Sequence, residues 1–392
     1  MRVPEGMANP HKLVCKLTKS LYGLKQASRQ WHDKLSHSLL AQGFVKSHYD
    51  HSLFIKKHHE DICIAAVYVD DILVTGNNLA EMEALKVNLH HEFSIKDLGQ
   101  LHYFLGLEVG YTDSGILLSQ GKFTKELLSF CKFDLSKKAS TPLPINLKLH
   151  ADLGDLLDDP STYRSLVGKL NFLTTSRPDL AYAVQNLSQF MQNPRTSHHD
   201  ALLHTLRYVA CTASQGIMLK ASDNLCLQAF SDSDWAACPD SRQSITGYIL
   251  LFGGSPITWK SKKQSIVSKS SSEAEYRAMA AAASEVTWAV RLLEDLGITN
   301  LKPVTLHCDN QSTLHIAKNP VFHERTKHIK IDCHFTREKV LEGLIHRTYL
   351  PTQKQLADIF TKILPSKQLN VLLHKLGMST TIPSNLRGGI GA

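Results

Sequence analysis

The chain has 392 residues, of which 43% are hydrophobic and 20% charged, so it is long enough for two or three domains with sizeable cores. Its 44 basic and 36 acidic residues give a formal net charge of +8, which fits a polyanionic partner as well as mere solubility. No run approaches the roughly 18 apolar residues of a membrane span, and the eight cysteines contain no Cys-x-x-Cys pair, which argues against a membrane protein, a disulfide framework and a zinc-ribbon protein. The scattered cysteines suit a reducing compartment.

The first elements lead to two adjacent acids. The periodicity predicts a helix over 17–42, and a hairpin of strands over 52–56 and 62–69 follows it. The second strand runs into Tyr68-Val-Asp-Asp71 and then another apolar run. Adjacent acids between apolar strands are costly unless they lie at an exposed hairpin tip or bind cations. We therefore expect Asp70 and Asp71 at such a tip.

The middle of the chain is predicted to be mainly helical. An extended segment over 103–109 follows the first of its helices, an irregular link begins at 141–144, and residues 216–227 are predicted to be a connection. The expected helices cover 80–91, 119–130, 163–174, 179–191 and 198–212.

The last third alternates between strands and helices. Strands are expected from 225 and over 245–252, 256–260, 304–308 and 345–350, and helices over 271–296, 311–317, 332–341 and 355–363. This order predicts an α/β domain.

Acids follow the strands of this region. Asp232 and Asp309 each come at the end of an apolar strand, and Glu275 lies near the start of the long helix. Carboxylates at the ends of adjacent strands converge on the crevice where α/β proteins bind ligands. They would repel one another unless a cation neutralised them, and hard oxygen ligands select Mg²⁺ or Mn²⁺. Asp358 is the expected fourth acid, with Asp332 as the alternative.

Other readings of these residues stay open. Glu275 could cap its helix, which would stabilise it by about 0.5–2 kcal/mol, with Ser270–Glu273 or Ser272–Glu275 as the capping box. Asp234, two residues after Asp232, competes with it for the same role. A zinc site could be suggested by four residues, His323, His328, Cys333 and His334. Their spacing matches no pattern of paired zinc ligands, so we do not expect one.

Five sequence motifs carry a family resemblance. They are Phe230-Ser-Asp-Ser-Asp-Trp-Ala236, Ser270-Ser-Ser-Glu-Ala-Glu-Tyr276, Cys308-Asp-Asn-Gln-Ser312, Arg325-Thr-Lys-His328 and Gln355-Leu-Ala-Asp-Ile-Phe-Thr-Lys362. Their order and their amino-acid sequences resemble the ribonuclease H domain of copia-type retrotransposon Pol polyproteins. Upstream, Leu17 to Ala27 resembles the nucleotide-binding helix of the reverse transcriptases of this family, and Tyr68-Val-Asp-Asp71 resembles their metal-binding pair. Near the end, Asn385-Leu-Arg-Gly-Gly389 resembles the end of such a polyprotein.

The resemblance implies a fold, domains and an activity. The fold would be an α+β, palm-like partial reverse transcriptase domain followed by an α/β ribonuclease H-like domain with a mixed five-stranded sheet. The implied domains are a partial reverse transcriptase palm (1–112), a helical thumb and connection region (113–224), a ribonuclease H-like domain (225–365) and a tail (366–392). Asp232, Glu275, Asp309 and Asp358 would hold two Mg²⁺ or Mn²⁺ ions and cleave the RNA strand of RNA–DNA hybrids.

The nucleic acid would contact basic side chains. The expected contacts are Lys25, Arg29, Lys260, Lys262 and Lys263, although the three last lysines could equally form a solvated loop.

The polymerase half is expected to be incomplete. In this family a further metal-binding acid precedes the segment that matches residues 1–6. We therefore expect an N-terminally truncated Pol fragment whose polymerase is inactive alone and whose missing part would come from other Pol chains. The alternative is a non-catalytic nucleic-acid-binding remnant of a decayed transposable element.

Overall fold

The computed structural model describes residues 23–131, 133–311 and 330–379, together with residues 3, 6–8, 13–18 and 21. Several predicted features fall outside these residues. They are the expected helix over 311–317 apart from position 311, the motifs at 325–328 and 385–389, and His323 and His328. The chain divides into two compact units, Met1–Gly99 with Arg291–Ile298, and Gln100–Val290 with Thr299–Ala392. Within the described ranges no helix is both long and apolar enough to cross a membrane.

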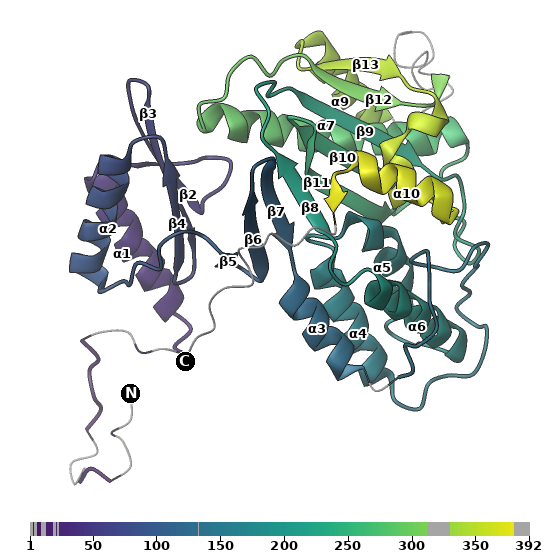
Figure 1. Ribbon diagram of the computed structural model, residues 1–392, viewed down its shortest axis with the longest axis horizontal. Helices are drawn as coiled ribbons and strands as arrows, with labels where there is room; N and C mark the ends of the chain where they lie inside the picture. The colour runs from purple at the N-terminus through teal and green to yellow at the C-terminus, as the bar shows by residue number, and fades with distance from the viewer. Residues whose placement is uncertain are drawn as a thin grey trace. The chain divides into compact units, whose positions relative to one another are not determined.

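The first unit is a four-stranded antiparallel sheet covered by two helices (Figure 1). Buried leucines of both helices join one apolar core with Phe54 and Val67 of the sheet. The expected hairpin and the expected helix over 80–91 are confirmed. In chain order the elements are α1 (Ala27–Ala41), β1 (Val45–Lys46), β2 (Leu53–His58), β3 (Asp61–Tyr68), β4 (Asp71–Gly76) and α2 (Leu79–Phe93).

The expected start of the first helix is wrong. The helix begins at Ala27 and not at Leu17. Gly23 has a φ of +88°, which a right-handed helix does not allow. Leu21 and Leu24 are 45% and 46% exposed, so the apolar periodicity there is not supported by packing. Only the later leucines, Leu35 and Leu39, are buried.

A second antiparallel sheet and a group of helices open the second unit. The sheet has the order β14-β8-β7-β6-β5. Residues 216–227 were expected to be a connection, and that expectation is wrong, because Gly216–Lys220 forms β8 and pairs with β7. The strands are β5 (Tyr103–Phe104), β6 (Leu107–Thr112), β7 (Gly115–Ser119), β8 (Gly216–Lys220) and β14 (Met378–Ser379); the helices are α3 (Gly121–Phe130), α4 (Pro160–Leu173), η1 (Pro178–Leu180), α5 (Ala181–Ser188) and α6 (Thr196–Cys211).

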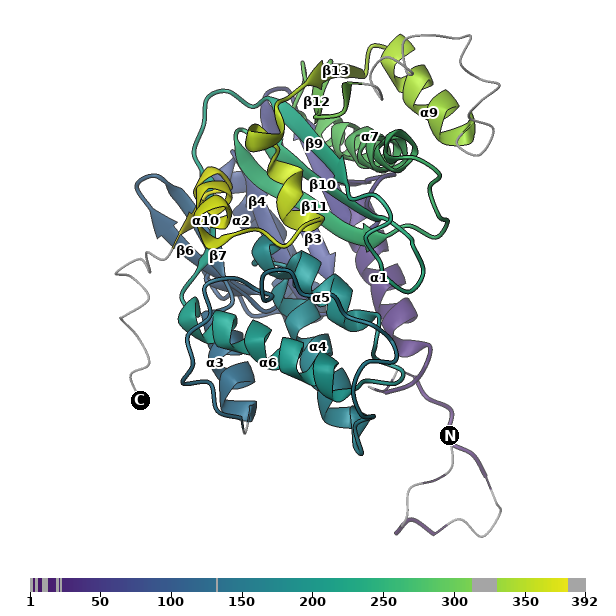
Figure 2. The same cartoon turned by 90° about the vertical axis from the view of Figure 1, so that its right-hand side faces the viewer.

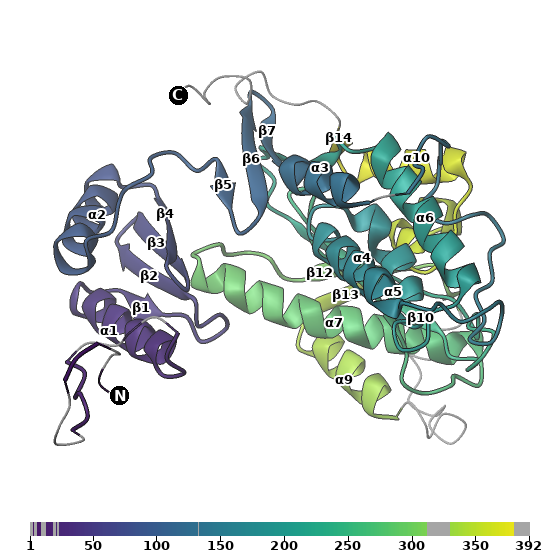
Figure 3. The same ribbon diagram turned by 90° about the horizontal axis from the view of Figure 1, so that it is seen from below.

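The third sheet is five-stranded and mixed, which confirms the expected fold class. Its order is β11-β10-β9-β12-β13; β9, β10 and β11 pair antiparallel, and β12 runs parallel to both β9 and β13. Tyr248 of β10 donates a hydrogen bond to Glu285 of α7, a long unbroken helix (Figure 3). The elements are β9 (Leu227–Ser233), β10 (Ile245–Phe252), β11 (Ser255–Lys263), α7 (Ser271–Asp295), β12 (Val304–Cys308), α9 (Lys330–Leu341) and β13 (Ile345–Tyr349).

The segment after β13 differs from the expected helix over 355–363. It forms two short 3-10 turns, η4 (Thr352–Lys354) and η5 (Leu356–Phe360). They are followed by α10 (Ser366–Lys375), which lies in the range expected to be a tail. Buried residues of η5 and α10 share one core with α4, α5, α6 and the third sheet (Figure 2).

Glycine allows η5 to approach the sheet closely. A Cβ at Gly247 would lie 2.7 Å from Thr361 Cγ2 and 2.8 Å from Phe360 Cβ. Gly247 pairs with Asp232 across β10 and β9, so this approach brings η5 next to Asp232. On the other side of η5, Gln355 Nε2 donates to the Ser231 carbonyl at 3.0 Å.

Candidate metal centre

The four predicted acids come from four different elements. Asp232 lies in β9, and Asp309 follows directly after β12, the parallel neighbour of β9. Glu275 lies near the start of α7, and Asp358 lies in η5. Parallel neighbours present their carboxyl ends at one edge, so the first two acids meet there.

The structure brings these four acids together. One carboxylate oxygen from each of Asp232, Asp309 and Asp358 lies within 4.8 Å of the other two. Glu275 and Asp309 form a second such group with the thiol of Cys308, so Asp309 belongs to both groups. Asp232, Glu275 and Asp358 are buried and Asp309 is partly exposed, at the wall of an open cleft. We call these four acids the acidic cluster.

Burial and mutual repulsion disfavour full ionisation of the acidic cluster. Burial raises the pKa of Glu275 well above its usual range, and the charges of Asp232 and Asp309 raise it further. Burial, followed by the charge of Asp232, raises the pKa of Asp358 to about 6. The cluster therefore needs positive charge close by.

One internal cation, Lys362, was not predicted. Its Nζ lies 2.8 Å from Asp358 Oδ1 and 3.2 Å from Asp232 Oδ2. Burial lowers the pKa of Lys362, but the charges of Asp232 and Asp358 outweigh this and raise it above its usual value. The only sequence signal was its position four residues after Asp358 in a motif already noted.

Two threonines that no sequence motif singled out orient the carboxylates. Thr361 Oγ1 donates a hydrogen bond to Asp232 Oδ2. Thr352 Oγ1 donates to Asp309 Oδ2 at 2.8 Å. Hydrogen bonds of this kind hold ligand carboxylates in position.

The donor set fits a hard divalent cation. Glu275 Oε1 accepts a hydrogen bond from the Ser233 N–H at 3.3 Å, but the buried Oε2 has no hydrogen-bond partner within the described ranges. An orphaned buried carboxylate oxygen beside other carboxylates is well suited to Mg²⁺ or Mn²⁺. Burial raises the pKa of the Cys308 thiol, which therefore stays protonated and leaves oxygen atoms as the ligands.

The alternative acids lie elsewhere. Asp332 of α9 pairs with Arg277 at 3.5 Å and belongs to neither group of the acidic cluster. Asp234 follows β9, and its Oδ1 accepts a hydrogen bond from the Ile245 N–H at 2.5 Å. Burial raises the pKa of Asp234 to about 7. It closes the loop between β9 and β10 and gives no oxygen to the cluster.

Asp70 and Asp71 lie at a hairpin tip, as expected. Tyr68 pairs with Asp71 across β3 and β4, which leaves Val69 and Asp70 as the turn. Both acids are exposed, and neither takes part in a group of three metal-ligating side chains in the part of the chain that the structure describes. Trp31 Nε1 of α1 donates to the Val69 carbonyl at 2.6 Å and so supports the tip.

The predicted basic contacts fall into two kinds. Lys25, Arg29, Lys260 and Lys262 are exposed, so they are accessible to a polyanion. Lys263 is partly buried, and its ammonium already contacts protein groups: its Nζ lies 2.8 Å from Gln189 Oε1 and 3.0 Å from Cys238 Sγ.

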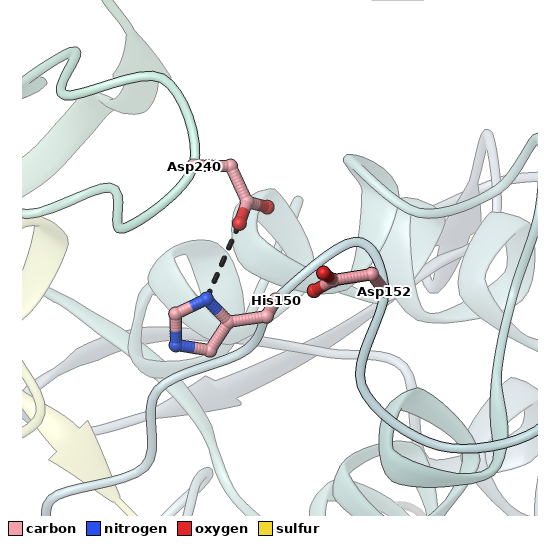
Figure 4. Close-up of side chains that lie close together, drawn as sticks. All are labelled: His150, Asp152 and Asp240. Atoms are coloured by element: carbon pink, nitrogen blue, oxygen red, sulfur yellow. Dashed lines mark ion pairs between the residues drawn. The ribbon is translucent and has the colours of Figure 1, made fainter.

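A further group of side chains contains His150, Asp152 and Asp240 (Figure 4). His150 Nδ1 lies 3.3 Å from Asp240 Oδ1, and the Ala151 N–H donates to Asp240 Oδ2 at 2.9 Å. Both aspartates are exposed. We interpret this group as a surface ion pair that joins two loops.

Comparison with known families gives a match in the first part of the chain. Residues 1–146 match the family described as reverse transcriptase (RNA-dependent DNA polymerase).

Related proteins cover nearly all of the chain. It is 44% identical over 371 residues to the retrovirus-related Pol polyprotein from transposon RE1 of Arabidopsis thaliana, a match that covers 95% of this chain and 25% of the relative. The corresponding protein from transposon RE2 of the same plant is 42% identical, with 98% and 26% covered. The chain thus spans about a quarter of the length of these relatives.

A shorter relative and a solved structure also match. The putative transposon Ty5-1 protein of Saccharomyces cerevisiae is 33% identical, with 70% of this chain and 91% of that protein covered. The N-terminal ribonuclease H domain of a Mycobacterium tuberculosis protein is 12% identical and covers 38% of this chain and 97% of its own, with a TM-score of 0.26.

Proposed function

Because the chain belongs to the family of retrovirus-related Pol polyproteins of copia-type transposons, we propose that it cleaves the RNA strand of RNA–DNA hybrids. The proposed domain is residues 225–365, with Asp232, Glu275, Asp309 and Asp358 as metal ligands. The observation that carries this proposal is the meeting of these four acids, from four elements, beside a cleft that Asp232, Glu275 and Asp309 line.

The roles of the residues follow from their placement. Two Mg²⁺ ions, when bound, would activate the attacking water and stabilise the leaving 3′-oxygen. Asp309 belongs to both groups of the acidic cluster, so it would help to hold the metal in either group. Thr361 and Thr352 would keep Asp232 and Asp309 turned towards the cleft. The exposed Lys260 and Lys262 would contact phosphates, and a wide minor groove with 2′-hydroxyls would mark the hybrid.

The test is cleavage of a labelled RNA–DNA hybrid in Mg²⁺, with double-stranded DNA and single-stranded RNA as comparison substrates. We expect Mg²⁺-dependent cleavage of the hybrid RNA, and a loss of at least about a hundredfold in Asp309→Asn, because that variant removes a ligand shared by both groups.

The matched control is Asp223→Asn, which removes an exposed carboxylate before β9 and should keep the wild-type rate. Equal rates in wild type and Asp309→Asn would contradict the proposal. Hybrid binding that weakens with salt, without any turnover, would instead favour the non-catalytic remnant.

A further inference from the structure

Lys362 is a partly exposed cation that is held by two buried carboxylates. Its ammonium contacts two carboxylates that are almost fully buried, since the side chains of Asp232 and Asp358 are 1% and 2% exposed. Its own side chain is 36% exposed and lines the same cleft as Asp309. The stem therefore reaches the acidic cluster from the open side.

We propose that Lys362 is the resident counter-ion of the acidic cluster, and that a divalent cation must displace its ammonium from Asp232 and Asp358 in order to bind. This inference rests on the metal site of the proposed function. It adds a positioning residue that lowers the apparent affinity of the site for metal and supports the metal-free fold.

The ammonium of Lys362 already contacts oxygen atoms that a divalent ion at the acidic cluster would use. Lys362 Nζ lies 2.8 Å from Asp358 Oδ1, and 3.3 Å and 3.2 Å from the two oxygens of Asp232. A magnesium ion bound to a carboxylate oxygen lies only about 2.1 Å from it. Because both oxygens of Asp232 face the ammonium, a divalent ion bound to Asp232 would lie close to this like charge and repel it.

The side chain of Lys362 is able to move away from the carboxylates into the open cleft. A lysine side chain has four rotatable bonds, and this one already borders the cleft. Thr361, its neighbour, is held by its own hydrogen bond to Asp232, so the ammonium is able to leave without moving that carboxylate. The site thus alternates between an internal cation and an external one.

The consequences have opposite signs in the two states. Without metal, removal of the ammonium leaves buried carboxylates that repel one another, so the protein becomes less stable. With metal, removal of the competing ammonium raises the apparent affinity for the divalent ion. The factor is one divided by the fraction of molecules in which the ammonium has already left the carboxylates.

The experiment compares Lys362→Met with Lys367→Met in the full 392-residue chain. Lys367 is an exposed lysine of α10, and its removal costs the same net charge. Mn²⁺ alone is titrated into each protein by calorimetry at pH 7.5. We expect Lys362→Met to bind Mn²⁺ about tenfold more tightly than wild type, and Lys367→Met to match wild type.

A second measurement does not depend on metal binding. In EDTA, Lys362→Met should unfold several degrees below Lys367→Met, and saturating Mn²⁺ should remove the difference. Lys362→Arg keeps the charge and should bind Mn²⁺ no more tightly than wild type. If Lys362→Met is too unstable to titrate, Lys362→Gln provides the same comparison.

The outcomes separate this inference from the proposed function. Equal Mn²⁺ affinities in wild type and Lys362→Met, with binding abolished in Asp232→Asn, would overturn the counter-ion role and leave the metal site standing. No Mn²⁺ binding in any of these proteins would overturn the metal site and the counter-ion role together.

Discussion

At the scale of single residues, the carboxylates near the start of α7 have separate tasks. Glu273 takes part in the capping: it accepts a hydrogen bond from the Lys269 N–H at 2.8 Å, and its own N–H donates to Ser270 Oγ at 3.2 Å. The Ser270 side-chain half of the expected Ser270–Glu273 capping box is present, whereas the Glu273 carboxylate accepts from the residue before Ser270. Glu275 is therefore not needed as the cap, and its side chain joins the acidic cluster instead.

The same scale decides between the two candidates for the fourth acid. Asp358 lies in the acidic cluster, whereas Asp332 pairs with Arg277. We expect Asp358→Asn to lower the rate of hybrid cleavage by at least about tenfold, because it removes a ligand oxygen. Asp332→Asn should stay within about threefold of wild type. Both are measured as kcat/KM on the labelled hybrid in Mg²⁺, and a larger loss in Asp332→Asn would reverse the assignment.

At the scale of elements, the position of Asp358 and Lys362 depends on how η5 packs. This short 3-10 turn has little stability of its own and is held by β9 and β10. Gly247 gives it space, and Gln355 ties it to the Ser231 carbonyl. A disturbance of this packing should reach the acidic cluster without touching any ligand.

Gly247→Ala tests that dependence. Its methyl group would meet Thr361 Cγ2 at 2.7 Å and the Ala357 carbonyl oxygen at 3.0 Å, so η5 must shift. We expect a loss of about 1–3 kcal/mol in the free energy of unfolding, as for overpacked cores, together with weaker Mn²⁺ binding. Urea denaturation and Mn²⁺ titration measure the two effects.

The control is Gly168→Ala in α4, where an added Cβ meets nothing within 4 Å. This exchange should be neutral or stabilise the helix by up to about 1 kcal/mol. If both alanine variants behaved alike, close packing at Gly247 would not be what positions η5.

At the scale of the whole molecule, the two units carry different sets of acids. The second unit gathers four carboxylates at one cleft, whereas Asp70 and Asp71 of the first stand exposed at a hairpin tip. In the described part of the chain no third metal ligand accompanies that pair. Phosphoryl transfer requires metal ions held in line with the reacting groups, and loss of a ligand costs orders of magnitude in rate.

We therefore expect no measurable primer extension by the 392-residue chain on its own. The assay is extension of oligo(dT) on poly(rA) with purified protein and Mg²⁺ or Mn²⁺, in parallel with the hybrid-cleavage assay on the same preparation. Primer extension by the wild-type chain that is lost in Asp70→Asn would contradict this prediction. It would mean that the hairpin tip holds the metal ions without a third acid from the part of the chain that the structure describes.

Features that depend on neighbouring residues could be predicted from the sequence. The hairpin with Asp70 and Asp71 at its tip, the strand ahead of Asp232 and the strand ahead of Asp309 follow from apolar periodicity and turn residues. The remaining features depend on contacts between distant parts of the chain. Lys362 and Thr361 reach Asp232 from 130 and 129 residues away, β8 forms only because β7 pairs with it, and α1 starts only where its leucines find a core. Local patterns cannot specify such contacts, because their free energy comes from partners that are adjacent only after folding.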